Sequence, residues 1–339
     1  MTDFKPYLAV LAAGPPLARD EARAAFSLIL DSKTTPAQLG AFLMGLRMRG
    51  ESVEEIIGAA QAMRAAMTPV EAPPDAIDIV GTGGDGAGTY NISTLAAIIV
   101  AGCGVPVAKH GGKAASSRSG ASDVLGELGV RVGIDASAAA ACLREAGICF
   151  MAGPTHHPAL RFAAPVRSEL GVRTIFNLLA PLCNPARVTR QVIGVYAQEW
   201  LEPLARALKE LGSKRVWLLH GSDGLDEATT TGATHVAALE DGAVRAFEIA
   251  SEDAGLPRAR AADLVGGDPA HNAGALLAVL EGAKNPYRDI AVFNAAIALV
   301  VAGAAPDLRA GAARAAAALG DGAARETLAK LVRASNHGA

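Results

Sequence analysis

Large aromatic side chains are scarce in this chain of 339 residues. Phe, Trp and Tyr supply 4% of the sequence, whereas hydrophobic residues of all kinds supply 51%. A sizeable core is therefore possible, but Ala, Leu, Val and Ile must fill most of it. The chain also has no excess of basic residues, and its formal net charge of −3 disfavours a nucleic acid as partner.

Cysteine is sparse, and long apolar runs are missing. The 4 cysteines, Cys103, Cys142, Cys149 and Cys183, form no C-x-x-C pair and no Cys/His metal spacing. Such scattered cysteines are typical of buried thiols in a reducing compartment. The N-terminus has no signal-peptide pattern, and the Ala-rich apolar runs are too short to span a bilayer. We therefore expect a soluble cytoplasmic protein with no membrane partner.

Residues 1 to about 68 have only helical patterns. Thr35-Pro36 begins a helix whose apolar residues follow at i, i+3, i+4 and i+7, and Gly50 ends it. Ser52 and Glu55 form a capping box for the next helix. The segment Glu71-Ala72-Pro73-Pro74 is typical of a linker. These residues predict a small helical domain at the N-terminus.

After the linker, short apolar runs alternate with helical patterns, which indicates a parallel sheet covered by helices. Strands are expected at 77–80, 105–108, 148–151 and 215–219, and a hairpin at 234–239 and 244–249, joined at Asp241-Gly242. Helices are expected near 93–102, 122–129, 136–146, 271–283, 289–303, 306–319 and 322–334.

These elements predict an α/β protein with a small all-helical N-terminal domain and a larger α/β domain with a mainly parallel central sheet. The length also suggests two domains. We expect residues 1–70 to form the helical domain, completed by helices near 168–192. Residues 75–165 and 193–339 are expected to form the α/β domain.

A glycine loop, Gly81-Thr82-Gly83-Gly84-Asp85, directly follows the first predicted strand. Ser93-Thr94 opens a helix just beyond it, and this order of strand, loop and helix brings backbone N–H groups against phosphate. The loop lacks the Lys-Ser/Thr of a P-loop and does not fit G-x-G-x-x-G. Because a carboxylate beside phosphates needs a cation or a hydroxyl group, Asp85 suggests Mg²⁺ or a ribose. A plain glycine turn is the alternative.

Two further polar loops follow predicted strands, at the edge of the sheet where open α/β folds bind ligands. The segment 109–120 combines cations, glycines and hydroxyl groups, which suits wrapping a polyanion; a solvated basic loop is the alternative. The segment 220–227 ends in Asp226-Glu227. Adjacent carboxylates repel unless a cation neutralises them, and oxygen ligands near phosphates suit Mg²⁺. Such a pair alone is often an exposed helix N-terminus.

Together these segments resemble the anthranilate phosphoribosyltransferase family. The shared motifs, in chain order, are Gly81-Thr82-Gly83-Gly84-Asp85, Asn91-Ile92-Ser93-Thr94, Lys109-His110-Gly111 through Ser116-Ser117, His157-Pro158-Ala159, Pro165-Val166-Arg167, Arg173-Thr174, Phe176-Asn177, Pro181-Leu182-Cys183-Asn184-Pro185 and Gly224-Leu225-Asp226-Glu227. The resemblance runs from about residue 4 to residue 334. It implies the nucleoside phosphorylase/phosphoribosyltransferase type of fold, with a hinge between the domains, and a homodimer formed through the helical domain.

The family transfers the phosphoribosyl group of phosphoribosyl pyrophosphate to the amine of anthranilate, with Mg²⁺, in tryptophan biosynthesis. The resemblance assigns donor binding to Gly81, Thr82, Gly83, Gly84, Asp85, Thr89, Asn91, Ser93, Thr94, Lys109, Gly111, Ser116 and Ser117. It assigns Mg²⁺ to Ser93, Asp226 and Glu227, and anthranilate to Gly81, His110, Gly112, His157, Arg167 and Ala180. Lys109 and Arg167 would position the substrates and stabilise the leaving group, and the uncharged amine needs no strong base.

Two departures from the family pattern fall in the acceptor region. The family usually has Asn and then Arg where this chain has Gly112 and Lys113, and Gly where this chain has Ala180. They leave open a paralogous enzyme that uses the same donor with another aromatic acceptor. A silent nucleic-acid-binding relative and a nucleoside phosphorylase are further alternatives. The acidic net charge disfavours the first of these two, and the Asp226-Glu227 pair disfavours both.

Overall fold

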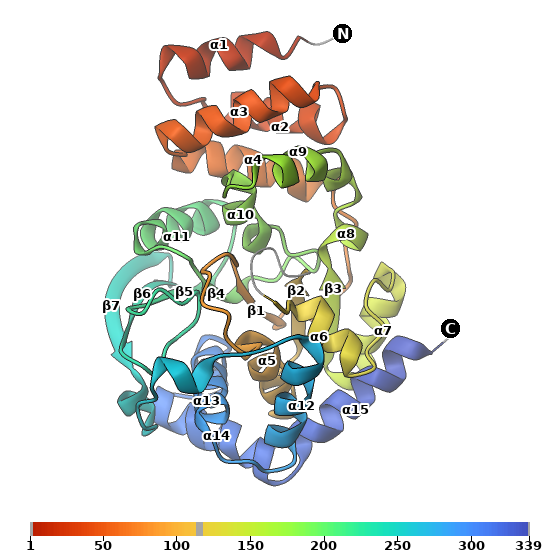
Figure 1. The fold of residues 1–339 in the computed structure, drawn as a ribbon, viewed down its shortest axis with the longest axis vertical. Helices are drawn as coiled ribbons and strands as arrows, with labels where there is room; N and C mark the ends of the chain where they lie inside the picture. Colours follow the sequence, from red (N-terminus) through yellow and green to blue (C-terminus); the bar gives the residue numbers. More distant parts are fainter. Residues whose placement is uncertain (1–2, 113–117, 338–339) are drawn as a thin grey trace.

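The computed structural model describes residues 3–112 and 118–337. The first helices form a bundle at one end of the molecule: α1 (Lys5–Ala13), α2 (Arg19–Leu30), α3 (Pro36–Arg49) and α4 (Val53–Ala66) (Figure 1). The predicted helix starts are confirmed, because Thr35 and Ser52 each accept a hydrogen bond from the backbone N–H three residues later. Gly50 ends α3 as predicted, with a φ of 89°.

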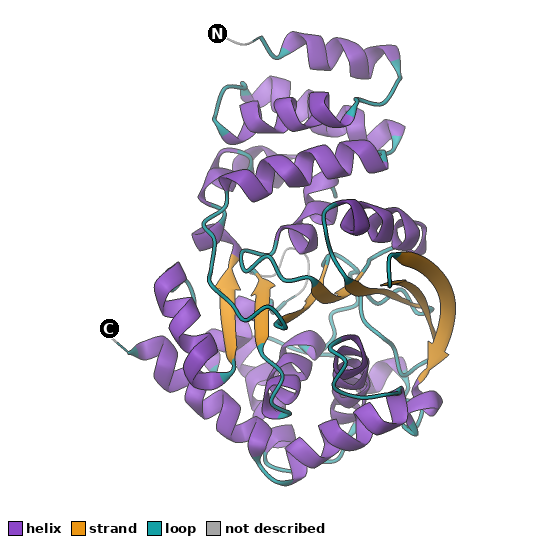
Figure 2. Cartoon of the chain, turned by 180° about the vertical axis from the view of Figure 1, so that it is seen from behind, coloured by secondary structure: helices purple, strands orange, loops and turns teal. Residues whose placement is uncertain are grey.

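The rest of the chain builds a seven-stranded sheet with helices on both faces (Figure 2). Its strands are β1 (Ile77–Gly81), β2 (Val107–Gly111), β3 (Ile148–Ala152), β4 (Arg190–Gly194), β5 (Arg215–Gly221), β6 (Ala233–Glu240) and β7 (Ala243–Ala250). The order is β3-β2-β1-β4-β5-β6-β7; the first five strands are parallel, and β6 and β7 are antiparallel to their neighbours. The predicted α/β class with a mainly parallel sheet is therefore confirmed.

The predicted hairpin turn between β6 and β7 is also confirmed. Asp241 and Gly242 have φ values of 50° and 74°. Positive φ at both central residues is what a two-residue type I′ turn needs, and its twist matches that of the strands.

The sheet separates two hydrophobic cores. One face is covered by α5 (Ile92–Gly102), α7 (Ala136–Ala146), α12 (Pro269–Leu280), α13 (Pro286–Val301), α14 (Leu308–Gly320) and α15 (Ala323–Asn336). The other face meets α4, α10 (Ile175–Leu179) and α11 (Leu201–Glu210). Successive residues of a strand point to opposite faces, so Val192 of β4 lies in the first core and Ile193 in the second.

Short helices join the sheet to the bundle. After β3 come α8 (Gly153–His156) and α9 (Ala164–Leu170), then α10, and α6 (Ala121–Glu127) precedes α7. The rings of Phe176 in α10 and Phe26 in α2 pack edge to face, 5.6 Å apart. Residues 163–183 thus extend the core of the bundle towards the sheet. In the described part of the chain, every helix is too short or too polar to cross a membrane.

The expectation of helices near 168–192 is wrong in its last part, because Arg190–Gly194 forms the central strand β4. A strand that opens with Arg and Gln does not show an apolar run. Gln191 is nevertheless buried, and its side chain donates to the Pro181 carbonyl oxygen at 2.9 Å.

Two strands differ from the predicted ranges by two residues or more at one end, and the other predicted strands by one residue. β2 begins at Val107 rather than at residue 105 and continues to Gly111, so Lys109 and His110 lie in the strand and not in the following loop. β5 likewise continues to Gly221 and includes His220. Lys109 finds partners at the site, as described next, and His220 Nδ1 lies 2.8 Å from the Val195 carbonyl oxygen.

Candidate active site

The site begins where backbone pairing between β1 and β2 stops. The two strands pair only at Ile77 and Val107, whereas β1 and β4 pair over five residues. Beyond Ile77, two charged side chains bridge the gap: Asp78 Oδ1 accepts from the His110 backbone N–H at 3.0 Å, and Lys109 Nζ donates to the Ile79 carbonyl oxygen at 2.5 Å. We call this reciprocal pair of contacts the strand clasp.

Asn184 completes the strand clasp, because its side-chain amide donates to Asp78 Oδ2 at 2.7 Å and to the Ala108 carbonyl oxygen at 2.9 Å. Burial raises the pKa of Asp78 to about 6, although Lys109 and these hydrogen bonds act against it. Burial lowers the pKa of Lys109, and Asp78 and Glu227 oppose that change. The clasp therefore fixes the buried ammonium of Lys109 between β1 and the start of α5.

The predicted glycine loop follows β1 and has a backbone that only glycine adopts readily. Gly83, Gly84, Gly86 and Gly88 have φ values of 68°, 81°, 74° and 63°. Asp226 Oδ2 accepts from the Gly83 N–H at 2.6 Å, which ties the loop after β5 to the loop after β1.

The start of α5 lies against the same loops. The Ser93 N–H donates to Glu227 Oε1 at 3.2 Å, and Ser93 Oγ accepts from Lys109 Nζ at 3.2 Å. The hydroxyl of Thr94 is buried and has no hydrogen-bond partner among the described residues. These groups and Asp226 bring together residues predicted from three separate segments of the sequence.

Other predicted donor residues are already engaged by neighbours. Thr82 Oγ1 accepts from the Tyr196 N–H at 3.0 Å, and Thr89 pairs with Val265 in an isolated bridge. Asn91 Oδ1 accepts from Asn272 Nδ2 at 2.9 Å. The sequence predicts Asn272 as part of a loop-to-helix cap, and its side chain does accept from the Gly267 N–H at 2.8 Å. Tyr196 was missed, because nothing local in the sequence marks it as a neighbour of the glycine loop. The predicted residues Ser116 and Ser117, and the departure Lys113, lie outside the described residues.

The adjacent carboxylates at 226 and 227 fit a divalent cation. Burial raises the pKa of Asp226 well above its usual range, and the nearby carboxylates of Asp85 and Glu227 raise it further. Burial also raises the pKa of Glu227 to about 7, although Lys109 opposes this. No group of three or more His, Cys, Asp or Glu in the described part of the chain could hold a metal alone. An ion there would take its remaining oxygens from substrate and water, as Mg²⁺ commonly does.

A cavity of about 640 Å³ lies between the end of β1, the end of β2 and the helices that lead to the bundle. It contains all the predicted anthranilate residues: Gly81, His110, Gly112, His157, Arg167 and Ala180. Thr82 and Gly111 also line it, so it reaches the end of the glycine loop. Ala180 and Gly112, the two departures from the family pattern, both border this space.

The cavity holds one partly buried guanidinium and two neutral imidazoles. Arg167 stacks over the Phe176 ring at 5.0 Å and has neither a carboxylate partner nor a side-chain hydrogen bond in the described ranges. Burial lowers the pKa of Arg167. Burial, and then the proximity of His157, lowers the pKa of His110 to about 3; burial lowers that of His157 to about 4. Their ring centroids lie 5.1 Å apart.

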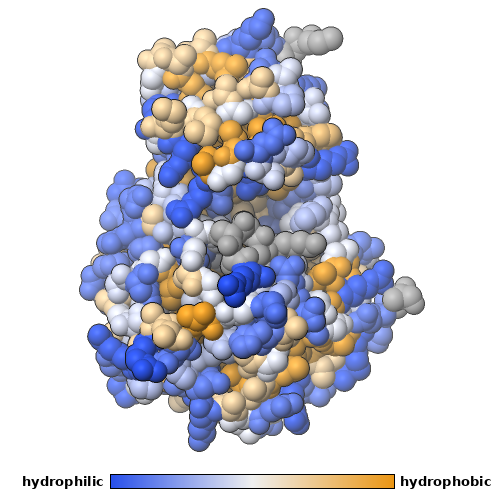
Figure 3. All heavy atoms as spheres, in the orientation of Figure 1, coloured by the Kyte–Doolittle hydropathy of each residue, from blue (hydrophilic) through white to orange (hydrophobic). Residues whose placement is uncertain are grey.

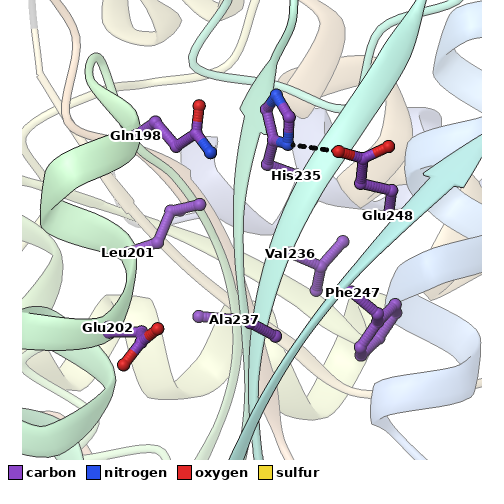
Figure 4. A pocket seen from close by; sticks show the side chains of 9 residues that line it. Gln198, Leu201, Glu202, His235, Val236, Ala237, Phe247 and Glu248 are labelled. Carbon is purple, nitrogen blue, oxygen red and sulfur yellow. Dashed lines mark ion pairs between the residues drawn. The ribbon is translucent and has the colours of Figure 1, made fainter.

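A second pocket, of about 310 Å³, lies between α11 and the strands β6 and β7 (Figure 4). Its polar side chains are satisfied or exposed: His235 Nδ1 lies 3.1 Å from Glu248 Oε1, and Glu202 pairs with Arg206. It shares no residue with the larger cavity. Nothing in its lining selects a particular ligand.

The fold and the site define a two-domain glycosyl transferase. The helical bundle domain of the glycosyl transferase family matches residues 5–67, and the a/b domain of that family matches residues 73–325. Anthranilate phosphoribosyltransferase of Methylocella silvestris is 65% identical over 336 residues, covering 99% of this chain and 96% of the relative. That of Beijerinckia indica is 63% identical over 99% of this chain and 98% of the relative.

Solved structures agree with these relatives. Anthranilate phosphoribosyltransferase from Thermus thermophilus superposes with a TM-score of 0.92 at 39% identity, covering 97% of this chain and 99% of that one. The Saccharomyces cerevisiae enzyme in complex with phosphoribosyl pyrophosphate and Mg has a TM-score of 0.90 at 30% identity, covering 98% and 97%. This chain therefore belongs to the anthranilate phosphoribosyltransferase family.

Proposed function

We propose that this protein transfers the 5-phosphoribosyl group from phosphoribosyl pyrophosphate to the amine of anthranilate, with release of diphosphate, as a step of tryptophan biosynthesis. The observation that carries the acceptor assignment is Arg167. An unpaired, partly buried guanidinium that lines a cavity needs an anion, and its planar fork matches a carboxylate. Its stacking on Phe176 holds the fork in place before the acceptor arrives.

The neutral histidines suit the amine of the acceptor. Because their pKa values are low, His110 and His157 stay uncharged near neutral pH and do not repel Arg167. His157 Nε2 and both ring nitrogens of His110 are buried without hydrogen-bond partners among the described residues. An imidazole nitrogen can accept a hydrogen bond from the anthranilate amine and orient its lone pair towards the ribose.

For the donor, we propose the glycine loop, the start of α5, Lys109 and the Asp226–Glu227 pair as the binding residues. Backbone N–H groups of the loop and the helix start favour phosphate oxygens. Ser93, Asp226 and Glu227 would hold Mg²⁺, which neutralises the negative charge that develops on the leaving diphosphate. Lys109, fixed by the strand clasp, adds a positive charge on the same side.

The helical end supports a proposed homodimer. Met48 of α3 is 83% exposed, and apolar side chains gather on this end of the molecule (Figure 3). The homodimer and a cytoplasmic location remain predictions. Analytical ultracentrifugation of the wild type and of a Met48→Glu variant tests the first: a dimer that weakens in the variant supports it.

Loss of anthranilate fluorescence in the presence of phosphoribosyl pyrophosphate and Mg²⁺ tests the reaction. We expect turnover that stops when a chelator removes the metal. We expect Arg167→Ala to raise the KM for anthranilate at least tenfold more than that for the donor, since a charged hydrogen bond to the carboxylate is lost. Binding of the donor without any consumption of anthranilate would contradict the proposal and favour another acceptor.

A further inference from the structure

Arg173 reaches the glycine loop from the helical side of the molecule. It lies between α9 and α10, in the segment whose neighbours pack on the bundle. A Cβ placed on Gly84 would be 3.4 Å from Arg173 Nε, which is van der Waals contact. The guanidinium therefore stands beside the loop after β1, across the boundary between the two parts of the chain.

Tyr196 holds this guanidinium in place. The guanidinium carbon of Arg173 lies 4.4 Å from the centroid of the Tyr196 ring, a cation–π distance. The Tyr196 backbone N–H in turn donates to Thr82 Oγ1 at 3.0 Å. The support of Arg173 is thus tied to the same glycine loop that Arg173 faces.

Arg173 is partly buried and makes no side-chain hydrogen bond or ion pair with any residue in the ranges 3–112 and 118–337. Two other partly buried arginines are paired, Arg215 with Glu240 at 3.2 Å and Arg288 with Asp289 at 2.8 Å, whereas Arg167 at the larger cavity is, like Arg173, unpaired among the described residues. Stacking leaves the edge of a guanidinium free, and that edge carries five N–H donors. An ordered but unpaired guanidinium at a glycine loop indicates an anionic ligand.

The charge of the donor site favours a phosphate ligand for this group. Three carboxylates, Asp85, Asp226 and Glu227, lie near one another, and Lys109 is the cation that contacts the start of α5. A diphosphate carries several negative charges, so one divalent ion and one lysine leave part of that charge uncompensated. A guanidinium beside the loop can bind two phosphate oxygens at once.

We infer that Arg173 is a ligand of the diphosphate group of the donor, an inference that rests on the proposed function. In the transfer, the bond between ribose C1 and the diphosphate oxygen breaks, and its electron pair stays on the diphosphate. The anthranilate nitrogen forms the new bond to C1 and releases one proton to water. Arg173 stabilises the negative charge on the departing diphosphate, in addition to Lys109.

Arg173→Gln and Arg173→Lys test this role. Arg325→Gln is the control, because it removes the same positive charge from an exposed position in α15. KM and kcat are measured for both substrates, and inhibition constants for inorganic pyrophosphate and for ribose 5-phosphate, all with Mg²⁺. For Arg173→Gln we expect kcat/KM for the donor to fall about 10- to 100-fold and pyrophosphate inhibition to weaken similarly. Ribose 5-phosphate inhibition and the KM for anthranilate should change less than about twofold. Arg173→Lys should recover part of the loss.

Three results would overturn the inference: unchanged donor kinetics in Arg173→Gln, a rise confined to the KM for anthranilate, or weaker ribose 5-phosphate inhibition with normal pyrophosphate inhibition. Each requires an active wild type. A wild type that binds no phosphoribosyl pyrophosphate by calorimetry would instead refute the proposed function itself. The two failures are therefore distinguishable.

Discussion

A single methyl group added at Gly194 should separate the two loops that form the proposed donor site. An ideal Cβ at this residue of β4 would lie 1.5 Å from the backbone oxygen of Asp226 and 2.3 Å from its carbonyl carbon. Nonbonded carbon and oxygen atoms need roughly 3.4 Å, so one backbone must move by roughly 2 Å. β4 is hydrogen-bonded to β1 and β5 on both sides. The displacement should therefore fall on Asp226.

The expected cost follows from these contacts. Forced overpacking costs about 1–3 kcal/mol, and losing the hydrogen bond from the Gly83 N–H to the Asp226 carboxylate, 2.6 Å long, costs about 1.5–3 kcal/mol. We expect Gly194→Ala to lower the free energy of unfolding by about 3–5 kcal/mol. A displacement above 1 Å at a binding carboxylate should also lower kcat/KM for the donor about 100-fold or more.

Urea unfolding followed by circular dichroism and calorimetric titration with phosphoribosyl pyrophosphate and Mg²⁺ measure the two effects. Gly126→Ala is the matched control, because Gly126 lies in α6 with no atom within 4 Å of its Cβ position; it should stabilise by about 0.5–1 kcal/mol. Gly81→Ala is intermediate, since its Cβ would lie 2.4 Å from the Asp226 carboxylate but 3.4 Å from the Asp226 backbone oxygen. A Gly194→Ala protein within about 1 kcal/mol of the wild type and with unchanged donor affinity would refute the reasoning.

Three further predictions concern the metal, pH and acceptor size. Asp226→Asn combined with Glu227→Gln should make turnover insensitive to Mg²⁺ concentration and at least about 100-fold slower; unchanged activity would remove the metal assignment. The pKa of His110 is about 3 in the fold and about 6.5 when unfolded, so its contribution to stability is complete above pH 6.5 and is lost as pH falls towards 3. When the pH is lowered from 7.5 to 5, the free energy of unfolding measured with urea should fall by about 2 kcal/mol less for His110→Asn than for the wild type. Ala180→Gly should lower the KM for a methyl-substituted anthranilate about fourfold more than the KM for anthranilate, because burying one methyl group contributes a free energy of this size. The same ratio of the two KM values in the variant and in the wild type would contradict this.

Local patterns were sufficient for the elements whose signals lie within a few residues. Capping boxes and an Asp-Gly turn specify their own hydrogen bonds and φ values, so the starts of α3 and α4 and the β6–β7 hairpin could be predicted from sequence. β4 could not, because Arg190 and Gln191 interrupt the apolar pattern and are accommodated by tertiary contacts: Arg190 donates to the Ala302 carbonyl oxygen, 112 residues away, and Gln191 to the Pro181 carbonyl oxygen. The extension of β2 through Lys109 could not be predicted either, because Lys109 also depends on tertiary contacts.

The resemblance placed residues around the site, but the contacts that position them needed the structure. Asp78 lies in an apolar run that predicts only a buried strand, yet its carboxylate occupies the gap between β1 and β2. Arg173 and Tyr196 lie far apart in the sequence, and only the folded chain shows that they stack. Such pairings depend on the arrangement of strands, which periodicity does not encode.

The order of the strands explains why the two proposed substrate sites meet at the end of β1. The chain builds β1, β2 and β3 towards one edge of the sheet and then returns to place β4 on the other side of β1. Open α/β sheets bind ligands at such a reversal, where neighbouring loops diverge. The loops after β1, β4 and β5 meet there through Thr82, Tyr196 and Asp226. On the other side of β1, the larger cavity lies beside the end of β2, where the strand clasp replaces backbone pairing. Gly81 borders both spaces, since it lines that cavity and a Cβ there would strike Asp226. The absence of a side chain at this residue leaves the cavity and the loop that carries Asp226 next to each other, as the proposed transfer between the two sites requires.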